Sequence, residues 1–155
     1  MCFVLYAGTT TALPRKAFNK DAQDLSVESL TDRDTAIRRY FRNPEVQSVG
    51  STSGCGCDFP HVILQNGEWP VFEHTEKDEL DIARDISNRR NVEALVALLR
   101  TNGDKMVELY GVWDGGNEVF DKSPQDQEEI SMQRLLELGF RFKERTFYKV
   151  RLSPD

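Results

Sequence analysis

The chain has 155 residues, and a domain of this size buries roughly 70% of the surface that its unfolded chain exposes. It therefore needs no disulfides or metal ions in order to fold. Its 20 Lys and Arg residues against 26 Asp and Glu residues give a net charge of −6. This charge opposes binding to nucleic-acid phosphates or to an anionic membrane surface, so we expect neither as a partner.

No stretch of the sequence has the composition of a targeting or membrane-spanning segment. The apolar run MCFVLYAG has no basic segment before it and no small-residue cleavage site after it, and no run approaches the about 20 apolar residues that span a bilayer. The three cysteines, Cys2, Cys55 and Cys57, are too few for a disulfide framework. We therefore expect a cytoplasmic protein whose cysteines are thiols.

The first third of the chain predicts three strands and one helix. The run 2–6 is apolar without alternation, which favours a central strand covered on both faces. Thr31 is placed to cap a helix that ends before Pro44. The predicted elements are strands over 2–6, about 25–30 and 45–49, and a helix over 32–42.

A hairpin is predicted next, over 61–65 and 68–72. Asn66 and Gly67 separate its two apolar runs, and this pair favours a two-residue turn in which both positions take positive φ. Pro70 confines the second strand to a sheet edge.

A long helical pattern follows, with Thr75 as its cap and Gly103 as its stop signal. The polar residues 87–91 interrupt its apolar stripe. Two helices and one kinked helix are both compatible with this pattern.

The last third predicts strand, helix, strand. Residues 106–113 predict a strand, and Ser123 with Pro124 would begin a helix over 124–138 that ends at Gly139. From Phe140 onward, apolar and basic residues alternate as in a strand with one basic face. Because these elements form neither a regular βαβ series nor an all-β pattern, we predict a single α+β domain over 1–155, with a mixed β-sheet and about three helices.

The most distinctive stretch is GSTSGCGCDF, residues 50–59, which we call the CGC loop. If residues 55–57 are extended, the side chains of Cys55 and Cys57 point to the same face and both sulfurs can reach one soft metal ion. A closed zinc site needs more ligands, for which His61 is the nearest candidate and Cys2 another; His74 and Asp58 also have suitable donors.

Three other interpretations of the CGC loop stay open. The cysteines can form a redox pair, although Asp58 stands beside them and no Lys or Arg does. The backbone N–H groups of the loop can cradle an anion, although the Lys of a phosphate-binding loop is missing. Finally, the glycines can provide unusual backbone angles while the cysteines simply fill small buried spaces.

The basic residues near the C-terminus form a second candidate site. They can bind an anionic ligand, or they can be the charges that guard an exposed edge strand. These residues are Arg141, Lys143, Arg145, Lys149 and Arg151.

The start MCFxLYxGT and the GCGC loop together resemble a small uncharacterised bacterial protein family. The resemblance implies no activity. It does imply that Cys2, Gly8 and Thr9 lie near the CGC loop.

The sequence thus favours a thiol-based or thiolate-metal site formed by Cys55, Cys57, His61 and Cys2, with zinc as the candidate metal. The alternative is a non-catalytic interaction or binding domain in which CGC is a structural turn.

Overall fold

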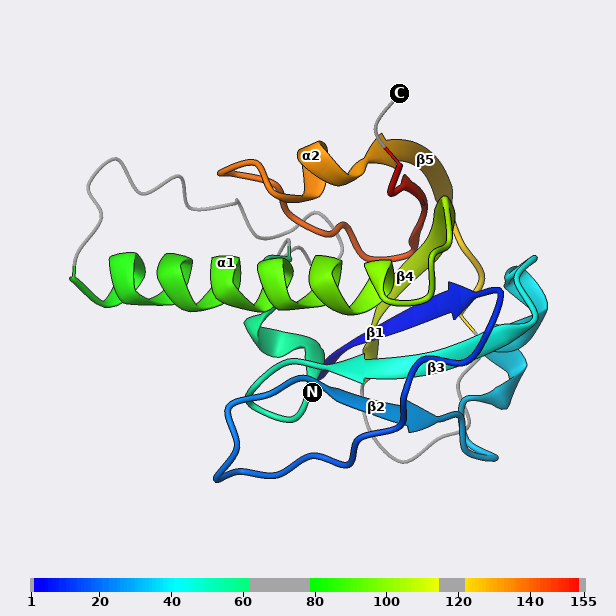
Figure 1. Ribbon diagram of the computed structural model, residues 1–155, viewed down its shortest axis with the longest axis horizontal. Helices are drawn as coiled ribbons and strands as arrows, with labels where there is room; N and C mark the ends of the chain where they lie inside the picture. Colours follow the sequence, from blue (N-terminus) through cyan, green and yellow to red (C-terminus); the bar gives the residue numbers. More distant parts are fainter. Residues whose placement is uncertain (1, 62–78, 115–121, 154–155) are drawn as a thin grey trace.

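The computed structural model describes residues 2–61, 79–114 and 122–153, which form a mixed six-stranded sheet with helices packed on it (Figure 1). The order of the strands is β2-β3-β1-β4-β6-β5, and only the β5–β6 pair is parallel. The α+β class and the mixed sheet predicted from the sequence are confirmed. The strands are β1 (Cys2–Thr9), β2 (Ser26–Ser29), β3 (Glu45–Gly50), β4 (Met106–Asp114), β5 (Asp126–Ser131) and β6 (Thr146–Arg151).

Strand β1 lies inside the sheet, as its unbroken apolar run predicts, between β3 and β4. Its alternate side chains reach opposite faces, so Leu5 belongs to one buried cluster and Tyr6 to the other. Opposite Leu5 on β4 is Gly111, where an added Cβ would lie 2.2 Å from the Phe3 ring. Glycine at this position therefore leaves the space that the Phe3 ring occupies.

One face of the sheet is covered by α1 (Glu79–Arg100), a single helix of 22 residues (Figure 1). Its buried residues Val92, Leu95 and Leu99 pack in the same core cluster as Phe3 and Leu5. The polar interruption at 87–91 therefore does not divide the helix. None of the helices in the described ranges is long and apolar enough to cross a membrane.

The opposite face is covered in part by η1 (Thr35–Tyr40), a 3-10 helix whose Ile37 packs with Tyr6 and Tyr110. The predicted helix over 32–42 is thus shorter than expected and begins later. The reason is a turn before it, in which Asp34 Oδ1 accepts a hydrogen bond of 2.7 Å from the Thr31 N–H. Asp34, and not Thr31, is the N-terminal flanking residue.

The predicted helix over 124–138 is wrong. Residues 126–131 form the edge strand β5, which pairs with β6 from Asp126 opposite Thr146 to Ser131 opposite Arg151. Only α2 (Met132–Leu135) is helical, with the Ser131 side chain accepting a hydrogen bond from the Arg134 N–H. The backbone of this segment forms hydrogen bonds with the edge of β6. The free energy of that pairing outweighs a modest local preference for helix.

Strand β6 is likewise not the exposed edge that its basic residues suggested. It lies between β4 and β5, and it begins only at Thr146. The charges at this edge of the sheet are instead the acids of β5, among them Glu128 and Glu129. The predicted hairpin lies outside the described residues except for His61.

Candidate thiol and metal site

The CGC loop is held in shape by its own backbone. The Ser51 N–H donates to the Cys55 carbonyl at 2.7 Å, and the Gly54 N–H donates to the Ser51 carbonyl at 2.9 Å. Gly54 has a φ of 95°, in the left-handed region that glycine adopts without strain. The loop then enters the 3-10 turn η2 (Gly56–Asp58), so residues 55–57 are not extended throughout as the sequence argument assumed.

The middle glycine of CGC brings the loop onto strand β1. A Cβ added at Gly56 would lie 2.6 Å from the Phe3 carbonyl oxygen. No side chain fits in that space, so glycine is the residue that lets the two backbones approach. Figure 1 shows η2 between α1 and the N-terminal end of β1, and it contacts both elements.

A buried residue of α1 anchors the other side of the loop. Asn91 is 2% exposed, and its Oδ1 accepts the Thr52 N–H at 2.9 Å, while its Nδ2 donates to the Ser87 carbonyl at 2.9 Å. Sequence reasoning missed this residue. The signal was the polar interruption at 87–91 in an otherwise apolar stripe.

The loop and the start of β1 together form a cluster of three thiols. The Sγ atoms of Cys2, Cys55 and Cys57 all lie within 4.8 Å of one another. Cys2 is exposed and the other two are partly buried. The approach of Cys2 to the CGC loop, which the sequence could pose only as a question, is therefore present in the structure.

The surroundings of the two loop cysteines shift their pKa values in opposite directions. Burial alone raises the pKa of Cys55, but hydrogen bonds with Cys57, Ser53 and Cys2 outweigh burial and leave that pKa below its ordinary value. One of these is the Cys57 N–H, 3.4 Å from Cys55 Sγ. Burial, followed by the hydrogen bond with Cys55, raises the pKa of Cys57 to about 12.

The other predicted ligands are placed differently. His61 Nδ1 lies 2.7 Å from the Phe59 carbonyl oxygen, and its ring stacks on Phe3 with a centroid distance of 4.7 Å. Among the described residues, the cluster of potential metal ligands contains neither His61 nor Asp58. His74 lies outside the described residues.

The geometry suits a thiophilic ion. Zinc binds thiolate sulfur at about 2.3 Å, so the sulfurs of a tetrahedral site lie about 3.8 Å apart, compared with the present limit of 4.8 Å. Small side-chain rotations would bring the three sulfurs to that separation. Three ligands would leave the fourth position of a tetrahedral ion for water, another residue or a bound molecule.

The basic residues of the second candidate site lie in two parts of the chain, the segment before β6 and β6 itself. Lys143 pairs with Glu128 at 2.7 Å, and the Arg145 Nε donates to the Ser123 carbonyl at 2.8 Å. Arg141 is exposed in the segment before β6, whereas Lys149 and Arg151 belong to β6 itself. Anion binding by these five residues stays a prediction.

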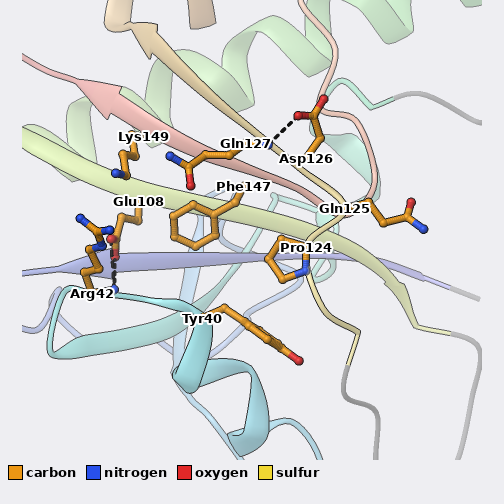
Figure 2. A pocket seen from close by; sticks show the side chains of 9 residues that line it. All are labelled: Tyr40, Arg42, Glu108, Pro124, Gln125, Asp126, Gln127, Phe147 and Lys149. Atoms are coloured by element: carbon orange, nitrogen blue, oxygen red, sulfur yellow. Dashed lines mark hydrogen bonds between the residues drawn. The ribbon is translucent and has the colours of Figure 1, made fainter.

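Lys149 lines an open groove together with residues from β4, the 40–42 segment and the start of β5 (Figure 2). At one end of this groove lie Arg42, Lys149 and the buried Glu108, whose carboxylate accepts the Arg42 N–H at 3.1 Å. Charges of both signs line the groove, so its charge does not favour an anionic ligand over a cationic one.

The comparisons with known proteins give no match: no family model, no curated protein and no solved structure is significantly similar to this chain.

Proposed function

We propose that the protein binds a thiophilic metal ion, with zinc as the first candidate, through the thiolates of Cys2, Cys55 and Cys57. The observation that supports this proposal is the convergence of three Sγ atoms from two separate segments within 4.8 Å of one another. Two of them come from a loop that a glycine and a buried asparagine hold against β1 and α1.

The burial of the cluster favours an ion that exchanges with solution over one that is sealed into the core. Cys2 is exposed, and Cys55 and Cys57 are only partly buried. The buried residues of the hydrophobic core, on both faces of the sheet, include none of the three cysteines, although Cys57 packs against one core cluster. Under this proposal the ion is a bound ligand, and folding does not depend on it. A reducing compartment such as the cytoplasm keeps all three thiols available.

The test is zinc binding by the full chain, purified under reducing, oxygen-free conditions. Metal content is measured by mass spectrometry, and affinity by competition with a chromophoric chelator. We expect stoichiometric zinc in the unsubstituted protein and an affinity loss of at least about tenfold in Cys2→Ser, Cys55→Ser and Cys57→Ser.

Thr52→Ser provides a matched control, because it changes the same loop and keeps all three cysteines. Circular dichroism melting of every variant separates loss of a ligand from loss of the fold. A folded protein that binds no stoichiometric zinc, or a Cys2→Ser variant with unchanged affinity, would contradict the proposal. The CGC loop would then be a structural turn in an interaction or binding domain.

A further inference from the structure

The three sulfurs of the cysteine cluster lie within 4.8 Å of one another, near enough for a side-chain rotation to bring two of them together in a disulfide. A disulfide requires two sulfurs about 2.05 Å apart, and a rotation about one Cα–Cβ bond moves a sulfur by a distance of the order of the remaining gap. Cys2 is the first residue of β1 and is exposed, so its side chain has room to rotate. It is also the thiol of the cluster that solvent reaches most readily.

The partner of Cys2 is decided by how the two loop cysteines pack. Cys57 packs against the hydrophobic core cluster that includes Phe3 and Phe59. Cys55 precedes η2 and accepts the Cys57 N–H at 3.4 Å, which stabilises negative charge on its sulfur. Cys55 is therefore the sulfur better placed to attack an oxidant, and Cys57 the one held by the core.

We propose that a peroxide oxidises Cys2 and Cys55 to an intramolecular disulfide, and that this oxidation releases a metal ion bound by the cluster. The release rests on the metal binding proposed above, whereas disulfide formation does not. The bond would join the first residue of β1 to the CGC loop. It would also remove two of the three thiolates from the ion.

The chemistry needs only the peroxide as oxidant. The Cys55 thiolate attacks one peroxide oxygen, so that an S–O bond forms, the O–O bond breaks and hydroxide (or alkoxide from an organic hydroperoxide) leaves. The Cys2 sulfur then attacks the resulting sulfenic acid; the S–S bond forms, the S–O bond breaks and water leaves. With hydrogen peroxide, the two thiols together lose two electrons and two protons, and one peroxide becomes two waters.

The first experiment uses metal-free full-length protein treated with hydrogen peroxide, digested with trypsin without reduction and analysed by mass spectrometry. Cys2 falls in the N-terminal peptide that ends at Arg15, and both loop cysteines fall in peptide 43–77. We expect these two peptides to be linked in the unsubstituted protein and in Cys57→Ser. No linked pair should form in Cys2→Ser or Cys55→Ser, and Cys2→Ser should instead retain a sulfenic acid at Cys55 that dimedone labels.

Either of two results would overturn the disulfide: a linked pair in Cys55→Ser as abundant as in the unsubstituted protein, or rapid closure of a Cys55–Cys57 disulfide in Cys2→Ser. Oxidation of the three cysteines without any linked peptide would also overturn it. All three results are read directly from the masses of the peptides.

The second experiment treats zinc-loaded protein with hydrogen peroxide and follows released zinc with a chromophoric chelator. We expect release at the rate at which the linked peptides appear, and rebinding after reduction with dithiothreitol. Zinc retained by the oxidised protein would overturn the release. If the disulfide forms but the reduced protein never bound zinc, the proposed metal function fails while the disulfide stands, so the two failures are distinguishable.

Discussion

Gly56 lies directly against the backbone of Phe3, so closely that a Cβ at position 56 would be 2.6 Å from the Phe3 carbonyl oxygen. This contact joins the middle of the CGC loop to the residue that follows Cys2. Because of this contact, Cys2 shares one cluster with Cys55 and Cys57, although it is far from them in the sequence.

The Gly56→Ala substitution should disperse the cluster although it removes no sulfur. The added methyl cannot coexist with the Phe3 oxygen, so the loop has to move away from β1. We expect a stability loss of about 1–3 kcal/mol and weaker zinc binding in the chelator competition assay.

Gly103→Ala is the control for that experiment. Its φ of 73° makes alanine strained there, at a cost of about 1 kcal/mol, but an added Cβ would meet nothing within 4 Å. Zinc affinity in this variant should equal that of the unsubstituted protein. Equal zinc affinity in Gly56→Ala would show that the Phe3 contact does not position the cysteines.

Asn91→Ala should loosen the CGC loop from the side of α1. The substitution removes the acceptor of the Thr52 N–H, a half-buried donor, and we expect a stability loss of about 1 kcal/mol. Hydrogen exchange of the Thr52 amide should become faster, as measured by nuclear magnetic resonance. In Asn19→Ala, which changes an exposed residue, that amide should exchange at its original rate.

Cys55 should react with iodoacetamide at a lower pH than Cys57. Only the thiolate reacts, and the hydrogen bonds around Cys55 lower its pKa, whereas burial raises the pKa of Cys57 to about 12. At neutral pH the label should therefore accumulate on Cys55. Fragment-ion mass spectrometry distinguishes labels on the two sides of Gly56, and faster labelling of Cys57 would contradict the arrangement.

The protein should lose stability in alkali because Tyr148 is buried as a neutral phenol. Burial raises the pKa of Tyr148 from 10.0 to about 12, and its hydroxyl oxygen accepts the Lys143 N–H at 2.9 Å. Since the unfolded chain releases this proton first, the folded state binds more protons between about pH 10 and about pH 12, and stability falls as pH rises through that window.

Urea unfolding at a series of pH values measures this effect, with tyrosinate absorbance as the second readout. Tyr148→Phe cannot ionise at this position, so its stability should decline less steeply above pH 10.0. An identical slope in the two proteins would assign the alkaline loss to other groups.

Leu109→Ala should destabilise the protein by about 2–5 kcal/mol, because Leu109 is 0% exposed on β4 and its removal leaves a cavity. Leu138→Ala makes the same chemical change at a side chain that is 79% exposed, and it should change stability by less than about 0.5 kcal/mol. Chemical unfolding of both variants gives the comparison. Similar losses would contradict the position of the core between β4 and α1.

The elements predicted correctly are those whose own sequence pattern matches their burial. The run that forms β1 is apolar without alternation because both of its faces are covered, by the core clusters of Leu5 and Tyr6. Strand β3 follows the same logic. For α1 the pattern predicted helix, but it left open whether the segment forms two helices or one kinked helix. The prediction of a helix over 124–138 is wrong because the acidic residues of this segment suit an exposed helix and an edge strand equally well, and the segment forms the edge strand β5.

For the candidate site, the sequence singled out the CGC loop and named Cys2 as a further sulfur from the residue types alone. The sequence could not establish the distance between these sulfurs. Cys2 and Cys55 approach each other only because η2 packs on β1, where the missing side chain of Gly56 leaves space for the Phe3 carbonyl. The sequence also ranked His61 as the nearest ligand by spacing along the chain. In the fold, the His61 ring stacks on Phe3. Among the described residues, His61 does not belong to the cluster of potential metal ligands.

The sequence by itself thus determined the α+β class, the central strand and the presence of three thiols, because periodicity and residue type are local properties of a chain. Only the tertiary structure decided that β6 is an inner strand, that 126–131 pairs with it, and that the three sulfurs lie within 4.8 Å of one another. These relationships join residues far apart in the sequence. Their free energy comes from backbone pairing and burial that exist only once the sheet has formed.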